Sequence, residues 1–148
     1  IQLATDKIRE NSLNFFTTFT NKNYVLEKVD FCLGQVGLIE ANNQPVASLS
    51  HGDCRKLEIA MALASDAKLL LLDEPMAGLG PSETQEMIAL LNKLKGKQTI
   101  LLVEHDMDAV FALADRISVL VSGEIIATGE PNNIRRDSKV QKAYLGEA

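Results

Sequence analysis

The sequence has few cysteines, no long apolar run and no excess of positive charge, and each shortage excludes a class of protein. Cys32 and Cys54 form no CxxC pair, so we expect reduced thiols in a cytosolic protein rather than a structural disulfide. The apolar runs are much shorter than the roughly 18 residues of a membrane-spanning helix, and no signal-peptide pattern is present. The net charge of −5 argues against a nucleic-acid-binding surface, because such domains are usually basic.

What is present fits a globular protein. The 148 residues are 46% apolar and 24% charged, which is the balance of an ordinary soluble domain. Their number suits one domain or part of a larger one. Because the first residue is Ile1 and not Met, we expect the chain to begin partway through a longer protein.

Hydrophobic periodicity changes character near residue 48. Residues 1–47 have a helical pattern, with apolar residues three and four apart between Val25 and Val36. Beyond it, short apolar runs with the length of buried strands alternate with helical segments. The expected strands are 68–72, 99–103, 116–121 and 125–128, of which the last two form a hairpin. The expected helices are 50–64, 82–94 and 106–114, with short helices in 134–145.

This alternation indicates an α/β fold with a mainly parallel sheet flanked by helices. In such sheets, ligands bind at the carboxyl ends of the strands. One expected strand ends at Asp73 and Glu74, and the next one ends at Glu104 and His105. We therefore expect two polar pairs on the same edge of the sheet.

The chemistry of these side chains suits phosphoryl transfer. Asp73 is placed to hold Mg²⁺, which prefers oxygen ligands and keeps several waters. Glu74 could orient or deprotonate an attacking water, and His105 could contact a phosphoryl oxygen, since catalysis here is mostly positioning and charge stabilisation. A DE pair at a strand end is common, and a lone histidine is more often solvated than functional. The expected position of these side chains on the same edge of the sheet is what favours a functional role for them.

Three motifs occur in a fixed order: LSHGD at 49–53, LLLLDEP at 69–75 and VEHD at 103–106. They resemble the signature motif, the Walker B motif and the switch histidine of ABC-type ATPases, and AGLG at 77–80 lies where that family has its D-loop. The stretches LEIAMALA, EHDMDAV, ADRI and AYLG look most like the ATP-binding subunits of branched-chain amino acid importers. The resemblance extends along nearly the whole chain.

The resemblance implies catalytic roles for three residues. Asp73 looks like the Walker B aspartate, which holds Mg²⁺ through water, and Glu74 looks like the base that polarises the attacking water. His105 looks like the switch histidine that touches the γ-phosphate of ATP. The implied fold is a partial P-loop NTPase fold of the ABC ATPase type.

The LSHGD stretch is expected to bind the cofactor. Ser50 and Gly52 look like signature residues that contact the γ-phosphate bound on a partner subunit, and the start of a helix suits an anion; Ser50 as a plain helix N-cap is equally compatible. His51 and Asp53, also expected at this site, depart from the commoner Gly and Gln or Glu. Gly80 stands where many relatives carry Asp, and we assign it no role.

One motif of the family is absent from the 148 residues. No GxxxxGK[ST] loop, whose backbone amides cradle phosphates, occurs in the sequence. Residues 1–4 resemble the segment just after the Q-loop, so the resemblance implies the C-terminal part of an ABC ATPase. We expect no appreciable ATP turnover by this chain alone. We also expect its uncovered apolar strands to promote self-association.

The resemblance also implies an organisation and partners. We expect a helical signature subdomain at 1–67, the Walker B and switch-histidine part of the α/β core at 68–130, and C-terminal helices at 131–148. The partners would be a second ABC ATPase subunit and membrane permease subunits, at the cytoplasmic face of the inner or plasma membrane. Phe15, Phe16 and Phe19 are candidates for the surface that faces the permease.

Three other functions stay open. The first is the ATPase of another ABC system, for urea, amides or lipopolysaccharide, because the motifs do not specify the solute. The second is a mechanical ABC ATPase of chromosome maintenance, although residues 1–47 lack the sustained heptads of its coiled coils. The third is a non-catalytic interaction fragment that has kept the motifs by descent.

Overall fold

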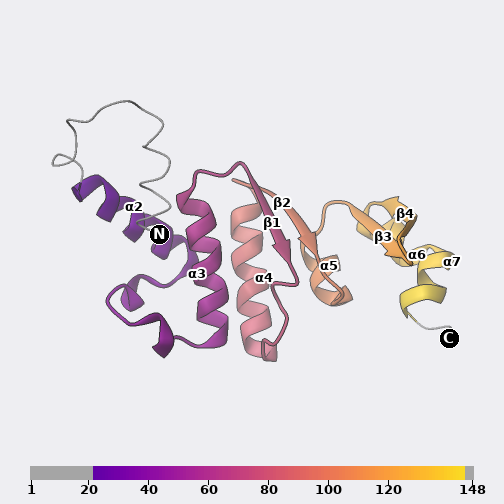
Figure 1. Cartoon of the computed structure of the whole chain (residues 1–148). Coiled ribbons are helices and arrows are strands. Elements are labelled where there is room, and N and C mark those ends of the chain that lie inside the picture. The colour runs from indigo at the N-terminus through magenta and orange to yellow at the C-terminus, as the bar shows by residue number, and fades with distance from the viewer. Residues whose placement is uncertain (1–21, 146–148) are drawn as a thin grey trace. The chain divides into compact units, whose positions relative to one another are not determined.

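The computed structural model describes residues 22–145, and Figure 1 shows them as a chain of helices and short strands. They belong to two compact units, one ending at Val103 and one beginning at Glu104. Each unit is described by itself. The expectations for residues 1–4 and for the three phenylalanines at 15–19 lie outside the described residues.

The first unit begins with helix α2, which is amphipathic as its spacing predicts. Apolar side chains on one face of the helix are buried, namely Val29, Cys32, Leu33 and Val36, and α2 packs against α3. Gly37 follows the helix with a φ of +78°, which is the left-handed backbone that commonly ends a helix. The helical elements here are α2 (Lys22–Val36), η1 (Ile39–Ala41), η2 (Val46–Ser48) and α3 (His51–Ala64).

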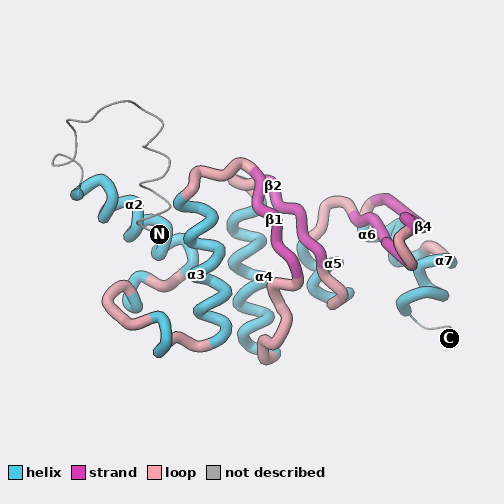
Figure 2. The backbone as a smooth tube through the Cα atoms, in the orientation of Figure 1, coloured by secondary structure: helices cyan, strands magenta, loops and turns pink. Residues whose placement is uncertain are grey.

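Strands β1 (Leu69–Asp73) and β2 (Thr99–Val103) form a parallel pair, joined through helix α4 (Pro81–Lys95) (Figure 2). Pro81 starts α4, where a missing N–H costs nothing. The buried residues of α4 form the stripe that the sequence predicts: Met87, Leu90, Leu91 and Leu94. A β-α-β unit of this kind is the basis of the α/β fold expected from the alternation of strands and helices.

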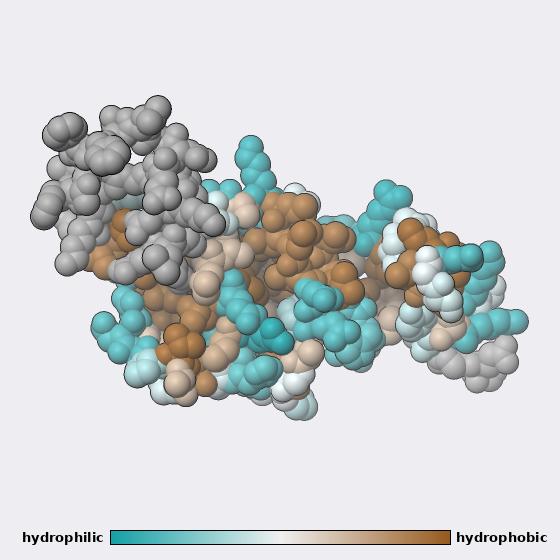
Figure 3. All heavy atoms as spheres, in the orientation of Figure 1, coloured by the Kyte–Doolittle hydropathy of each residue, from teal (hydrophilic) through white to brown (hydrophobic). Residues whose placement is uncertain are grey.

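One face of the parallel pair is open. Leu70 is buried, whereas its neighbours Leu69 and Leu71 and the β2 residues Leu101 and Val103 are exposed. Figure 3 shows apolar side chains gathered over this strand pair. The expectation that these strands are partly uncovered is thus confirmed.

The second unit contains helix α5 (Met107–Leu113) and the antiparallel hairpin of β3 (Ile117–Val121) and β4 (Glu124–Gly129). Ser122 and Gly123 form its turn, and both have positive φ, at 50° and 85°, as a two-residue hairpin loop requires. Its core consists of Ile117, Val119, Ile134 and Val140. The unit ends with α6 (Pro131–Arg136), α7 (Ser138–Val140) and the short π-helical η3 (Gln141–Leu145).

The described residues thus contain two separate two-stranded sheets, one parallel and one antiparallel. Along the sequence, the boundary between the two compact units falls between Val103 and Glu104. The division into 1–67, 68–130 and 131–148 follows the expected roles of the segments and stays a prediction. Of the helices that the structure describes, none is both long and apolar enough to cross a bilayer.

Candidate functional site

Asp73 and Glu74 lie at the carboxyl end of the parallel pair. Asp73 is the last residue of β1 and lies opposite Val103 of β2. The backbone amide of Glu74 donates a hydrogen bond to the Val103 carbonyl at 2.8 Å, so the pairing continues one residue beyond the strand. Both acidic residues are exposed to solvent at this edge.

Glu74 has an unusual backbone conformation. Its φ is +44°, in the left-handed region that residues other than glycine seldom occupy. Such a conformation costs on the order of 1–3 kcal/mol and tends to occur at functional sites. The Val103 carbonyl holds the Glu74 amide, and the Glu74 carbonyl accepts the Ala77 amide at 3.0 Å. The surrounding backbone thus fixes a strained residue at the point where β1 ends.

The segment 74–80 returns the chain from β1 to α4 in tight turns. The Leu79 amide donates to the Met76 carbonyl at 3.1 Å, and Gly78 has a φ of +77°. At the start of α4, the Gly80 amide donates to the Glu83 carboxylate at 3.0 Å. Gly80, which had no assigned role, is therefore the N-cap of α4.

Ser50 caps helix α3. Its Oγ accepts the Asp53 amide at 3.0 Å, and its carbonyl accepts the Cys54 amide at 3.0 Å. A hydroxyl that accepts one hydrogen bond still has its own O–H to donate. The first amides of a helix lack intrahelical partners and attract anions. The cap and an anion site are thus compatible at the same residue.

The two residues after Ser50 lie against the β1–α4 connection and the first turn of α4. His51 Nε2 lies 3.3 Å from the Ala77 carbonyl oxygen. Gly52 is buried, and a Cβ added there would come within 2.8 Å of Glu83 Oε1. The start of α3 is therefore fitted against the β1–α4 connection.

Asp53 forms an ion pair within its own helix, with Lys56 at 3.4 Å. Lys56 also reaches Glu86 of α4 at 2.7 Å. Burial lowers the pKa of Lys56, but the hydrogen bond and charge of Glu86, together with the charge of Asp53, outweigh burial and raise it. This cation therefore links α3 to α4. A cofactor-binding role for His51 and Asp53 stays a prediction.

His105 belongs to the second unit. Glu104, whose side chain is only 1% exposed, accepts hydrogen bonds from the His105 and Asp106 amides at 2.9 and 3.2 Å. The His105 side chain is 71% exposed. Asp106 caps α5 by accepting the amides of Asp108 and Ala109. The imidazole is thus presented to solvent on a well-fixed backbone, while its meeting with Asp73 and Glu74 on one edge stays a prediction.

The donor set at the strand end suits a hard cation held largely by water and phosphate. Within residues 22–145 no cluster of three or more His, Cys, Asp or Glu side chains could form a complete metal cage. The exposed carboxylate of Asp73 offers oxygen donors. Mg²⁺ is usually bound in this way, by one or two carboxylates plus substrate phosphates.

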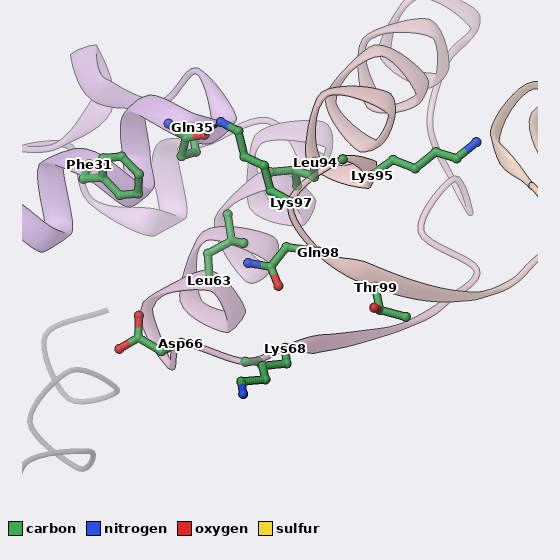
Figure 4. Close-up of a pocket in the computed structure, with 12 residues that line it drawn as sticks. Phe31, Gln35, Leu63, Asp66, Lys68, Leu94, Lys95, Lys97, Gln98 and Thr99 are labelled. Carbon is green, nitrogen blue, oxygen red and sulfur yellow. Dashed lines mark hydrogen bonds between the residues drawn. The ribbon is translucent and has the colours of Figure 1, made fainter.

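A cavity of about 620 Å³ lies at the opposite end of the strands, in the first unit (Figure 4). Lys68 and Thr99, at the amino ends of the two strands, line it, together with Phe31 and Gln35 of α2 and Lys97. The Lys97 side chain donates to Gln35 at 3.4 Å. Because the acidic residues lie at the carboxyl ends, this cavity is separate from the candidate site.

The family of the chain follows from comparison with known sequences. The family model described as ABC transporter matches residues 2–77, which contain the α3 cap, β1 and Glu74. The chain belongs to the ABC transporter family. A second family model, described as branched-chain amino acid ATP-binding cassette transporter, matches residues 124–148.

Individual ABC relatives agree with this assignment. The chain is 43% identical over 125 residues to the high-affinity branched-chain amino acid transport ATP-binding protein LivG of Escherichia coli, covering 83% of this chain and 49% of LivG. It is 35% identical over 144 residues to the methionine import ATP-binding protein MetN of Haemophilus ducreyi, and the match covers 95% of this chain and 42% of MetN. The chain thus spans about half the length of these relatives.

Solved structures place the fold in the same family. The crystal structure of MJ1267, an ATP-binding cassette of an ABC transporter in its ADP conformation, matches with a TM-score of 0.78 and 30% identity. The match covers 99% of this chain and 61% of that one. The α/β fold of the ABC ATPase type that the motifs imply is confirmed.

The contacts of two side chains at the site, Glu83 and His51, were not predicted from the sequence. Glu83 binds the Gly80 amide and lies against Gly52, and His51 lies against Gly78. The first had a signal, since a glutamate three residues after an N-cap is the pattern of a capping box. The second joins residues distant in sequence and leaves no local pattern.

Proposed function

We propose that this chain is the C-terminal part of the ATP-binding subunit of an ABC importer whose cargo is branched-chain amino acids. The placement of Asp73 and Glu74 carries the proposal, because both carboxylates stand at the carboxyl end of a parallel strand pair, where α/β folds bind ligands. The similarity to LivG and the match at residues 124–148 support the cargo.

The proposed roles are those that the resemblance to ABC ATPases implies for these residues. Asp73 would hold Mg²⁺ through water, and the ion would supply charge neutralisation to the phosphates. Glu74 orients the attacking water and accepts its proton, for which its fixed backbone is suited. His105 contacts the γ-phosphate. Ser50 and Gly52 would offer a hydroxyl and a backbone amide of the first turn of α3 to a γ-phosphate bound on the partner subunit.

The proposed partners complete both the site and the transporter. A second ATP-binding subunit would supply the phosphate-cradling loop that faces the LSHGD stretch. Permease subunits would hold the pair at the cytoplasmic face of the membrane. No nucleic acid is proposed as a partner, in keeping with the net charge of −5.

A different cargo is the second candidate. The similarity to MetN extends over 95% of the chain. The sequence of this part of an ATP-binding subunit therefore does not discriminate between importers of different cargo. Uptake of labelled leucine and labelled methionine by cells with and without the intact gene separates the two. Loss of leucine uptake supports the first candidate, and loss of methionine uptake alone supports the second.

The test of the activity is phosphate release from Mg·ATP by the purified chain, and by the chain joined to a segment with a GxxxxGK[ST] loop. We expect turnover from the joined protein only. Glu74→Gln should lower its kcat by roughly 10²- to 10⁴-fold, the usual contribution of a general base. Turnover by the 148-residue chain that Glu74→Gln abolishes would show a complete site within it. An unchanged kcat in Glu74→Gln would remove Glu74 as the base.

A further inference from the structure

The ring of His51 joins the start of α3 to the connection between β1 and α4. Its Nε2 lies 3.3 Å from the Ala77 carbonyl oxygen. A carbonyl can only accept, so Nε2 carries the proton and donates, which both the neutral Nε2–H tautomer and the imidazolium can do. The ring therefore reaches the backbone of the β1–α4 connection through one hydrogen bond.

The same ring packs against the backbone of Gly78. A Cβ added at Gly78 would lie 3.1 Å from His51 Nε2 and 3.5 Å from its Cδ2. Gly78 also has a φ of +77°, which only glycine adopts at no steric cost. His51 and Gly78 are thus a matched pair, in which a large ring fills the space that the missing side chain leaves.

Two hydrogen bonds through Ala77 connect the His51 ring to Glu74, the proposed general base. The Ala77 carbonyl accepts a hydrogen bond from the His51 ring, and the Ala77 amide donates one to the Glu74 carbonyl at 3.0 Å. One residue therefore stands between the ring and the strained backbone of Glu74. The α3 N-terminus, which the proposed function gives to the γ-phosphate of a partner site, is thereby connected to the segment that carries Glu74.

We propose that His51 is a positioning residue that holds segment 74–80, and with it Glu74, to the N-terminus of α3. The role of Glu74 in this inference rests on the proposed function, whereas the contact does not. His51 thereby acquires a function within its own subunit, distinct from contact with the cofactor.

Amide hydrogen exchange of the purified chain tests the positioning directly. His51→Ala should speed exchange of the Ala77 and Leu79 amides about fivefold, the change that loss of one ordinary hydrogen bond gives. His51→Gln should restore slow exchange, because its amide nitrogen donates at a similar reach. The Ala109 amide, bonded to Asp106 in the second unit, is the internal control. Unchanged exchange at Ala77 and Leu79 in His51→Ala overturns the inference.

A double-mutant cycle tests the match between His51 and Gly78. Gly78→Ala should reduce the folding equilibrium constant at least about fivefold more than Gly37→Ala, because overpacking adds to the backbone strain. Gly37 is the matched control, with a φ of +78° and nothing within 4 Å of an added Cβ. The excess should disappear in a His51→Ala background. An equal excess in both backgrounds means that ring and glycine do not meet, which overturns the inference.

The consequence for catalysis is measured on the chain joined to a GxxxxGK[ST] segment. His51→Ala should lower kcat about tenfold with little change in KM, and His51→Gln should recover most of it. An unchanged kcat alongside faster exchange would overturn the link to Glu74. If the parent itself releases no phosphate, the proposed function fails, and the exchange and stability results still decide whether His51 holds the segment.

Discussion

At the scale of single residues, Gly52 shows how closely α3 and α4 are fitted. An added Cβ would approach Glu83 Oε1 to 2.8 Å, and the other carboxylate oxygen of Glu83 accepts the Gly80 amide. We expect Gly52→Ala to displace Glu83 from its cap and to lower the free energy of unfolding by about 1 kcal/mol. Denaturant unfolding of the purified chain measures the change.

Gly34→Ala is the matched control for that prediction. Gly34 is also in a helix, but nothing lies within 4 Å of an added Cβ. The same substitution should there raise the free energy of unfolding by about 0.5–1 kcal/mol, through helix propensity. A stabilising Gly52→Ala would show that Glu83 moves aside without losing its hydrogen bond.

The sequence predicts the identity of the site residues better than their conformation. A leucine run that ends in two acids locates Asp73 and Glu74 at a strand end, because a short apolar run of this length is typical of a strand. The left-handed φ of Glu74 is not predictable in this way, since it depends on the Val103 carbonyl of a strand that follows later in the chain. The His51–Ala77 contact spans 26 residues and likewise depends on the tertiary fold.

At the scale of elements, Lys56 couples α3 to α4 through Glu86. In a double-mutant cycle of Lys56→Met and Glu86→Gln, we expect a coupling free energy of about 0.5–1 kcal/mol in unfolding near neutral pH. The coupling is not expected to be larger, because solvent screens the Glu86 side chain, which is 56% exposed. Methionine retains an apolar stem in place of the lysine chain.

The coupling has a defined dependence on pH. Since the pKa of Lys56 is raised in the folded chain, the pair contributes its full stability below the lysine pKa of the unfolded chain, about 10.4. That contribution is lost as pH rises through the folded value. Repeating the cycle near pH 8 and over a rising series of pH values beyond the lysine pKa of the unfolded chain should show the coupling fall toward zero as Lys56 loses its proton. A coupling that survives would point to packing rather than charge.

Elements with one strong period were the most predictable. The stripe of α4 agrees with the expectation because its buried residues keep a single helical period. The strand Thr99–Val103 agrees in its bounds because they are those of one short apolar run. Helix ends were less regular. Expected helix 106–114 is observed as Met107–Leu113, because Asp106 is its cap and not its first turn. The position of the cap depends on side-chain hydrogen bonds, which the hydrophobic periodicity of the sequence does not predict.

At the scale of the whole molecule, the open apolar face of β1 and β2 predicts self-association of the 148-residue chain. Leu71 is 68% exposed and Leu101 is 57% exposed. Within residues 22–145, β1 and β2 pair only with each other, and the outer edges of such a pair can template pairing with another chain. Light scattering at micromolar concentration should therefore show a species larger than the monomer. A sharp monomer peak would contradict this expectation.

Charge substitutions locate the surface that associates. Covering Leu71 contributes about 1–2 kcal/mol, since burying a whole leucine contributes about 1.5–3 kcal/mol. Leu71→Lys should therefore weaken self-association by roughly 5- to 30-fold. Ile125→Lys is the matched control, because Ile125 is 65% exposed on β4 of the second unit. Sedimentation velocity over a concentration series measures both variants. Equal weakening by the two would assign the association to apolar surface in general, and weakening by Leu71→Lys alone would assign it to the β1–β2 face.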